Sequence, residues 1–337
     1  MGEGPGEQIK YRVPRIESIS EEERESLMGM EVAREIKRVL DEVDAIHGRG
    51  ATPDKRLAFH NREHTEGTLR RGRSLRAAVH DALLAAGKPG IDRVTELLAE
   101  LAEVYHDRDQ EWGIKEGPDG ARIRYRVPGV SEEASAERLE AYMRDVNGKA
   151  GKEIFTAEHI RDTKEAIMAT VTVVDGTGVR RPNMLDPEHP PKLLTIGLAY
   201  GDLGSIGMEG FETSQMGQRA YFFETNMDIT IAIGNSLNTG KVIPVETKEL
   251  YWGRIRSWLY AQKDFITGWR DEFERELEII DPPQVRDALR ARFDKFDETI
   301  QGHGADIQEF EKLTSANFDD YIDRMRANLA FFENIGQ

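Results

Sequence analysis

The strongest constraint on the fold is the helical spacing of apolar residues along most of the chain. In IDRVTELLAELAEVYHD, residues 91–107, aliphatic side chains recur every three or four positions at Val94, Leu97, Leu98, Leu101 and Val104. This spacing gathers them on one face of an α-helix, where they can pack against a core. Similar patterns follow the capping residue Ser20 and fill most of the chain after residue 246. The sequence has no long strand-like alternation, so we predict an all-α fold.

Interruptions of this pattern predict three parts. They are an N-terminal segment and helix over 1–50, a helical core over 51–226, and a helical C-terminal extension over 227–337 that packs on the core. Glycine and proline predict polar loops at 113–129 and 175–192. We place Ser131 as an N-cap, and we expect helix breaks near 281–283 and 302–306. The β-branched stretch 227–245 is compatible with a short strand or a helix, and the sequence does not decide between them.

Composition excludes several classes of protein. The absence of cysteine removes disulfides, thiolate zinc sites and cysteine nucleophiles. The formal net charge of −16 repels nucleic-acid backbones, so we expect no nucleic-acid polymer as a partner, although a local basic pocket could still hold one phosphate. No apolar run approaches the roughly 20 residues of a spanning helix, and the N-terminus lacks a secretory signal. We therefore expect a cytoplasmic protein that does not associate with membranes.

A few polar residues interrupt the helical pattern at positions where an apolar residue would fit. His60 and His64 lie four positions apart, which would place both on one face of a helix. The pair His106-Asp107 ends an amphipathic segment, and Asp202 interrupts the apolar segment LLTIGLAYGDLGSIGMEG. A buried acid costs several kcal/mol unless it is paired or bound to a metal. Histidine and aspartate together form a good ligand set for a divalent cation such as Mn, Mg, Fe, Ni or Zn.

In this order, these residues resemble the HD-domain superfamily of metal-dependent phosphohydrolases. FHNREH is similar to the HNxxH entry motif of cyclic-nucleotide phosphodiesterases, and LAEVYHD resembles the helix that ends in the HD dyad. LAYGDLGSIGMEG resembles the late helix that carries the final aspartate, and GVSEEASAERLEAYM is similar to a Glu-x-x-Ser-Ala segment of bacterial members. The resemblance spans roughly residues 55 to 215. It departs at RDQEW after the dyad, where many members have a glycine-containing stretch.

The resemblance implies an HD-like helical fold and assigns a role to each residue of the motif. The implied metal ligands are His64, His106, Asp107 and Asp202. His60 falls where the phosphodiesterases protonate the leaving group, and Glu132 falls where an acid could orient water. From the sequence alone, Glu132 could equally be a first-turn acid that the helix dipole stabilises. The extra histidines of a dinuclear site lack their expected context, so we favour one metal ion per chain and leave a second one open.

Three basic residues are candidates for substrate binding. Arg124 and Arg126 alternate before Pro128 and could clamp a phosphate, or lie in a solvated loop. Lys263 could reach the site from the C-terminal helices. Those helices could cap the pocket, form a homodimer interface, or do both.

From these features we expect a metal-dependent phosphohydrolase. Its substrate would be a small phosphate ester, with a nucleotide first among the candidates, and a water activated by the metal would attack it. Two alternatives belong to other classes. One is a di-iron oxygenase on the same fold, which needs further histidine ligands. The other is a non-catalytic helical scaffold.

Overall fold

The computed structural model describes residues 16–48, 56–117, 120–175, 178–185, 192–329 and 331–332, and it confirms the predicted all-α fold class. The helices are α1 (Glu21–His47), α2 (Arg62–Ala85), α3 (Arg93–Tyr105), α4 (Val130–Ala150), α5 (Ala157–Met168), α6 (Leu193–Asp202), α7 (Gly204–Met208), α8 (Phe211–Thr225), α9 (Met227–Thr239), α10 (Val245–Glu278), α11 (Pro283–Arg292), α12 (Phe296–Phe310) and α13 (Phe318–Arg326). A 3₁₀ turn, Ser315–Asn317, precedes α13. Across the described ranges, no helix is long and apolar enough to cross a membrane.

Capping side chains begin several helices where polar residues precede the apolar pattern. Ser20 accepts a hydrogen bond from the Glu23 amide at the start of α1, as predicted, and Asp92 accepts one from the Thr95 amide at the start of α3. Asn61 accepts from the Glu63 and His64 amides and so fixes the first turn of α2. The predicted N-cap at Ser131 is wrong, because α4 begins at Val130 and Gly129 is the N-cap, so Ser131 lies inside the first turn.

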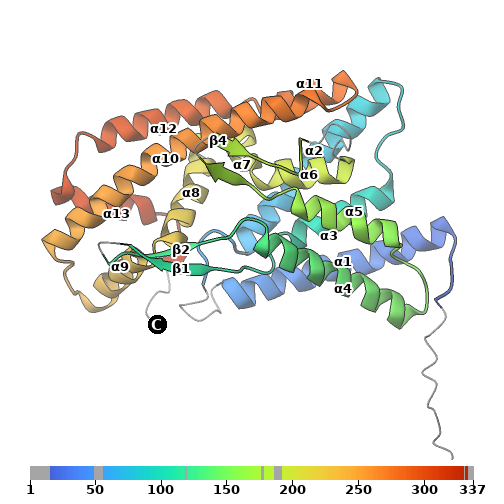
Figure 1. The fold of residues 1–337 in the computed structure, drawn as a ribbon, viewed down its shortest axis with the longest axis horizontal. Coiled ribbons are helices and arrows are strands. Elements are labelled where there is room, and N and C mark those ends of the chain that lie inside the picture. The colour runs from blue at the N-terminus through green and yellow to red at the C-terminus, as the bar shows by residue number, and fades with distance from the viewer. Residues whose placement is uncertain are drawn as a thin grey trace, which may run out of the picture.

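Three hydrophobic clusters hold the helices together. The first joins α1, α3, α4 and α5, and the second joins α2 and α6 to α11 and the second half of α10. The third joins α8, α9 and α13 to the first half of α10 and the end of α12. Figure 1 shows α8 between the two halves of the molecule, with α10 running from the half that holds α9 towards α11. The predicted division at residues 50 and 226 stays a prediction, although helices from all three parts share these clusters.

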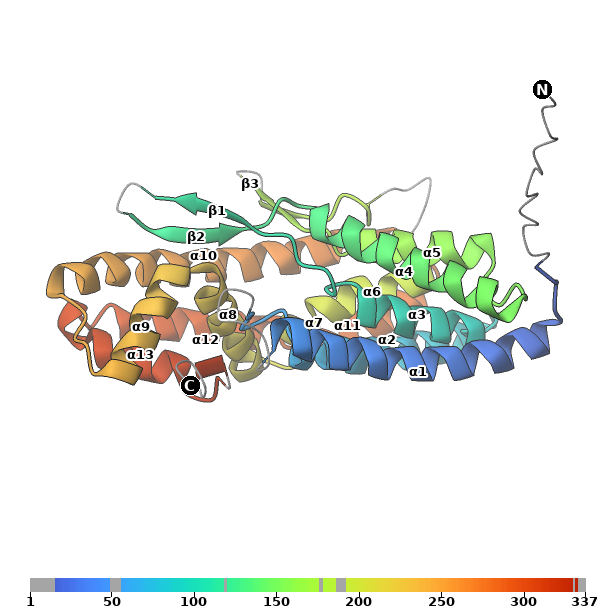
Figure 2. The same ribbon diagram turned by 90° about the horizontal axis from the view of Figure 1, so that it is seen from below.

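One short antiparallel hairpin lies within the first predicted loop, and a second begins two residues before the other predicted loop. Strands β1 (Gly113–Glu116) and β2 (Arg122–Tyr125) pair with Gly113 opposite Tyr125, and β3 (Val173–Asp175) pairs with β4 (Gly178–Arg180). Figure 2 shows the β1–β2 hairpin extending from the α3–α4 side over α10.

Two further segments differ from the sequence-based expectation or resolve it. The undecided stretch 227–245 contains helix α9, in which Ile229 and Ile233 lie one turn apart and are both buried in the third cluster. The predicted break at 302–306 is wrong, because α12 continues through it. Gly302 lies against the Phe211 ring, which a Cβ at that position would approach to 2.3 Å. The close packing offsets the roughly 1 kcal/mol that glycine costs inside a helix. The predicted break at 281–283 separates α10 from α11.

Burial of His303 on α12 predicts a pH-dependent stability. Its ring packs edge-on against Phe211, and within the described structure neither ring nitrogen has a hydrogen-bond partner. Burial, aided by the charge of Arg219, lowers the pKa of His303 to about 4. The unfolded chain, with a histidine pKa near 6.5, therefore binds the proton more tightly than the folded chain does. The neutral His303 therefore contributes fully to the free energy of unfolding above about pH 6.5. This contribution, about 3 kcal/mol, is lost as the pH falls to about 4.

The test compares the wild type with His303→Leu, which has a similar size and no titrating group. Urea unfolding between pH 4 and 7.5 should show a stability difference between the two proteins that changes by about 3 kcal/mol over this range. The difference removes the contribution of carboxylates, which both proteins share. A difference that stays constant with pH would contradict this assignment.

Candidate metal centre

Four side chains from three helices converge at one point. His64 Nε2 lies 3.0 Å from Asp107 Oδ2 and 3.1 Å from Asp202 Oδ1. His106 Nε2 lies 3.1 Å and 3.4 Å from the same two oxygens. One ligating atom from each residue lies within 4.8 Å of all the others. Elsewhere in the described ranges, no group of three or more such side chains brings its ligating atoms this close together.

All four side chains lie at or next to the ends of helices. His64 lies in the first turn of α2, His106 and Asp107 follow the end of α3, and Asp202 is the last residue of α6. Helices α2 and α6 pass very close to each other, because a Cβ on Gly201 would lie 3.2 Å from the Gly72 nitrogen. A larger residue at position 201 would push Asp202 away from His64.

Arg71 fixes the end of α6 from the side of α2. Its buried guanidinium donates from Nε to the Gly201 carbonyl at 2.6 Å and from Nη2 to the Asp202 carbonyl at 3.4 Å. A third donor, Nη1, reaches Glu209 at 3.2 Å. These contacts hold the backbone of one candidate ligand relative to the helix that carries another.

The unsatisfied nitrogens in the cluster fit a cation. His64 Nε2 and His106 Nε2 are buried, and neither is aligned for a hydrogen bond with a described residue despite the short distances to oxygen. His106 Nδ1 lies 2.8 Å from the Glu103 carbonyl, which can only accept, so Nδ1 carries a proton, and in the neutral imidazole Nε2 has a free lone pair. Ligands at right angles around a cation at about 2.1 Å lie about 3 Å apart. The buried His/Asp group is therefore compatible with a metal site.

The charges of the cluster residues also call for a positive group among them. Burial lowers the pKa of His64 and His106, but the two aspartates outweigh burial and raise both pKa values. Burial raises the pKa of Asp107 and Asp202, but the two histidines, joined at Asp107 by His60, outweigh it and hold both pKa values below the usual aspartate range. The carboxylates stay ionised and need positive charge beside them, which a bound cation or protons on the imidazoles can supply.

His60 occupies a different position from the one the spacing predicted. It precedes the Asn61 cap and does not lie on the helix with His64, and its ring centroid is 5.8 Å from that of His64. Its Nδ1 forms a very short contact with Glu224 Oε1, and its Nε2 lies 3.9 Å from Asp107 Oδ2. The ring therefore stands beside the cluster and is held by a carboxylate on its far side.

Glu224 is the site residue that sequence reasoning missed. It is 1% exposed, near the end of α8, and its Oε2 accepts hydrogen bonds from the Phe59 and His60 amides at 2.8 and 3.0 Å. Burial raises the pKa of Glu224, but the charge and hydrogen bonds of this partner segment outweigh burial and lower it. An acid directly after three aromatic residues, in YFFET, is a signal like the one that identified Asp202, and it could have identified Glu224.

Arg126 and Glu132 lie on the other side of His60. Arg126 Nη1 lies 3.0 Å from His60 Nε2, and its Nη2 donates to Glu132 Oε1 at 2.9 Å and lies 3.6 Å from Asp107 Oδ1. Burial lowers the pKa of Arg126, but the charges of Asp107 and Glu132 outweigh it and raise the pKa. Glu132 also accepts from the Gly129 amide at 3.1 Å, so it both begins α4 and holds Arg126.

The other two predicted basic residues lie elsewhere. Arg124 Nη1 lies 3.4 Å from the Arg56 carbonyl and 3.5 Å from the Glu224 carbonyl, so it ties β2 to the end of α8. Lys263 lies on α10, with its ammonium beside Gly304 of α12. Neither position puts the side chain among the cluster residues, and the substrate-binding roles of both stay predictions.

Comparison with family models, with curated proteins and with solved structures found no match for this chain. The relation to HD-domain proteins therefore stays a resemblance. What the structure adds is a predominantly helical fold with a buried His/Asp cluster that could hold a metal ion.

Replacing Asp202 by asparagine should remove metal binding. The amide keeps the size of the side chain but loses the charge that two imidazoles face, so the metal content after dialysis should fall from about one ion per chain towards zero. Inductively coupled plasma mass spectrometry measures this, and circular dichroism checks the fold. The matched control is Asp145→Asn on α4, an exposed carboxylate paired with Lys149. Equal metal content in the two variants would contradict the assignment.

Proposed function

We propose that this protein is a metal-dependent phosphohydrolase that acts on a small phosphate ester, with a nucleotide as the first candidate by resemblance. The observation that carries the proposal is the arrangement of Arg126 and the His60–Glu224 pair directly beside the His/Asp cluster. A divalent cation held by His64, His106, Asp107 and Asp202 would polarise a phosphoryl oxygen and lower the pKa of a water molecule. The remaining steps belong to side chains of the chain itself.

Arg126 binds and orients the phosphoryl group. Its guanidinium already faces the cluster at 3.6 Å from Asp107 Oδ1, and its raised pKa keeps it charged at neutral pH. A guanidinium matches phosphate with two parallel donors. Glu132 holds the arginine through Nη2 and so limits the directions in which it can turn.

His60 gives a proton to the leaving oxygen. A guanidinium can only donate, so in this structure His60 Nε2 accepts from Arg126 and the proton lies on Nδ1, facing Glu224. When Arg126 turns to a bound phosphoryl group, Nε2 becomes free to hold a second proton, and Glu224 stabilises the resulting imidazolium. Transfer of the Nε2 proton to the departing alkoxide then leaves neutral alcohol and neutral imidazole.

The di-iron alternative receives no support from the described residues, because among them only the four cluster side chains bring their ligating atoms together as a metal site requires. Four of the other histidines have contacts elsewhere. His47 Nε2 lies 3.3 Å from the Arg108 carbonyl, His80 accepts from the Ile91 amide, His159 belongs to the cap of α5, and His303 packs on Phe211. His189 lies outside the described residues. The number of metal ions per chain stays a prediction.

A substrate screen tests the proposal directly. The purified protein, reconstituted separately with Mn, Mg, Fe, Ni or Zn, should release phosphate from at least one nucleotide, sugar phosphate or p-nitrophenyl phosphate. Asp107→Asn should lose more than the roughly 100-fold that loss of an outer partner of a metal ligand costs. The Asp145→Asn control should retain full activity. A metal-loaded wild type that hydrolyses none of the esters would refute the proposal.

The effect of Glu224→Gln should depend on the leaving group of the ester, because Glu224 acts through proton transfer from His60. An alkyl alkoxide needs a proton as it departs, whereas p-nitrophenolate does not. The variant should therefore lose about 10²- to 10⁴-fold in kcat on alkyl phosphates and much less on p-nitrophenyl phosphate. The exposed Glu133→Gln serves as control, and metal content should stay at the wild-type level in both variants. Equal losses on the two ester types would show that Glu224 has only a structural role.

A further inference from the structure

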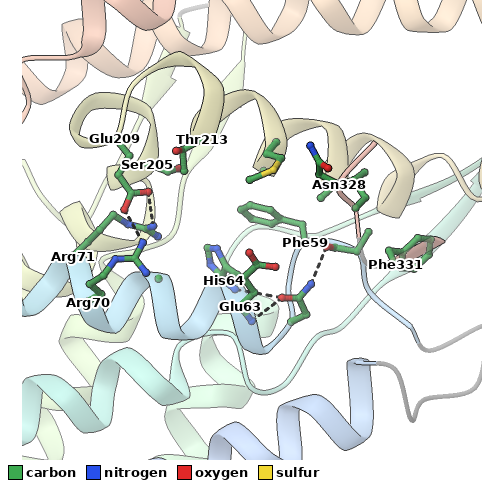
Figure 3. A pocket seen from close by; sticks show the side chains of 17 residues that line it. Phe59, Glu63, His64, Arg70, Arg71, Ser205, Glu209, Thr213, Asn328 and Phe331 are labelled. Atoms are coloured by element: carbon green, nitrogen blue, oxygen red, sulfur yellow. Dashed lines mark hydrogen bonds and ion pairs between the residues drawn. The ribbon is translucent and has the colours of Figure 1, made fainter. Parts of the chain in front are cut away.

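A cavity of about 170 Å³ lies between α2 and α8, directly beside the candidate metal centre. His64 belongs to both, because its ring lines the cavity while its Nε2 faces Asp107 and Asp202. Figure 3 shows Arg70, Arg71 and Glu209 at one end of the cavity and Phe59 and Phe331 towards the other. None of the functions assigned above uses this space.

The charges in the wall of the cavity balance one another. Arg70 Nη2 donates to Glu209 Oε1 at 2.7 Å, and Arg71 Nη1 donates to Oε2 of the same carboxylate at 3.2 Å. The remaining donors of Arg71 face carbonyls of α6 and the Thr68 hydroxyl. The second wall carboxylate, Glu63, makes two acids against two guanidinium groups, so the cavity does not favour a charged ligand of either sign.

The polar end still offers hydrogen bonds. The Arg70 side chain is 67% exposed, and among the contacts of the described residues it uses one of its five donors. The carboxylate oxygens of Glu209 keep lone pairs, and the hydroxyls of Ser205 and Thr213 line the same region. Donors and acceptors that stand side by side match hydroxyl groups, which donate and accept at once.

The other end is apolar. Phe59, Met216, Ala220, Leu329 and Phe331 line it. The Phe59 ring lies 4.4 Å from the His64 ring and 4.9 Å from the His60 ring, measured between centroids. A group that packs on Phe59 would therefore lie next to both the metal ligand and the proton donor.

We propose that this cavity binds the alcohol portion of the ester, an uncharged group with several hydroxyls and one apolar face. The inference rests on the proposed function for the position of the phosphoryl group. The hydroxyls meet Arg70, Glu209 and Thr213, the apolar face packs on Phe59, and the ester oxygen lies beside His60. A water molecule takes up about 30 Å³ in the liquid, so the cavity of about 170 Å³ suits a group that displaces about six waters, the size of one sugar ring.

Binding of uncharged alcohols to the metal-loaded protein tests the cavity without requiring turnover. The probes are adenosine, methyl glucoside and myo-inositol, measured by isothermal titration calorimetry. Wild type should bind at least one of them, and Met216→Trp, which fills the cavity, should weaken that binding at least tenfold. Thr213→Val should weaken it by less. The matched control Met30→Trp, at an exposed methionine of α1, should bind as wild type does.

The reaction and the cavity can fail separately. If esters are hydrolysed, their KM should rise in Met216→Trp in proportion to the size of the alcohol. Hydrolysis whose KM does not respond to Met216→Trp would overturn the cavity assignment and leave the reaction intact. Probe binding that Met216→Trp blocks, in a protein that hydrolyses no ester, would support the cavity and overturn the reaction. Binding of none of the three probes to the wild type would overturn the cavity assignment.

Discussion

The short separations between two imidazole nitrogens and two carboxylate oxygens are the constraint on which the site depends. Four such separations fall between 3.0 and 3.4 Å, yet neither Nε2 is aligned for a hydrogen bond within the described structure. Two ionised carboxylates in a buried setting are expensive without positive charge between them. The start of α2 and the ends of α3 and α6 must meet at this point, and the glycine contact between α2 and α6 allows this approach.

Around this centre, the rest of the chain supplies the groups to which we assign roles in the proposed reaction. The β1–β2 hairpin leads to Arg126, and α8 carries Glu224 behind His60. Both residues that flank Glu224 on its N-terminal side, Phe222 and Phe223, are buried in the cluster formed by the C-terminal helices. The C-terminal extension therefore has a definite structural consequence, because it holds α8 where Glu224 can reach His60.

Much of this arrangement could be predicted from the sequence. Apolar periodicity and caps such as Ser20 identify helices because they are local signals, and an acid in an apolar segment identifies Asp202. Contacts between distant segments leave no such local signal. Glu224 contacts His60 across 164 positions, and the hairpin that leads to Arg126 has the local sequence of a polar loop. The continuity of α12 through Gly302 depends on Phe211, a residue from another helix, so the sequence around the glycine predicted a break instead.

An anomalous diffraction experiment on crystals of the protein grown with Mn²⁺ or Zn²⁺ tests most directly whether the His/Asp cluster binds a metal ion. Data collected at the absorption edge of the metal locate the ion independently of any assumption about activity. We predict an anomalous peak at coordinating distance from the Nε2 atoms of His64 and His106 and from the carboxylates of Asp107 and Asp202, about 2.0–2.2 Å for zinc. A peak only at other residues, or an empty cluster in crystals saturated with metal, would contradict it.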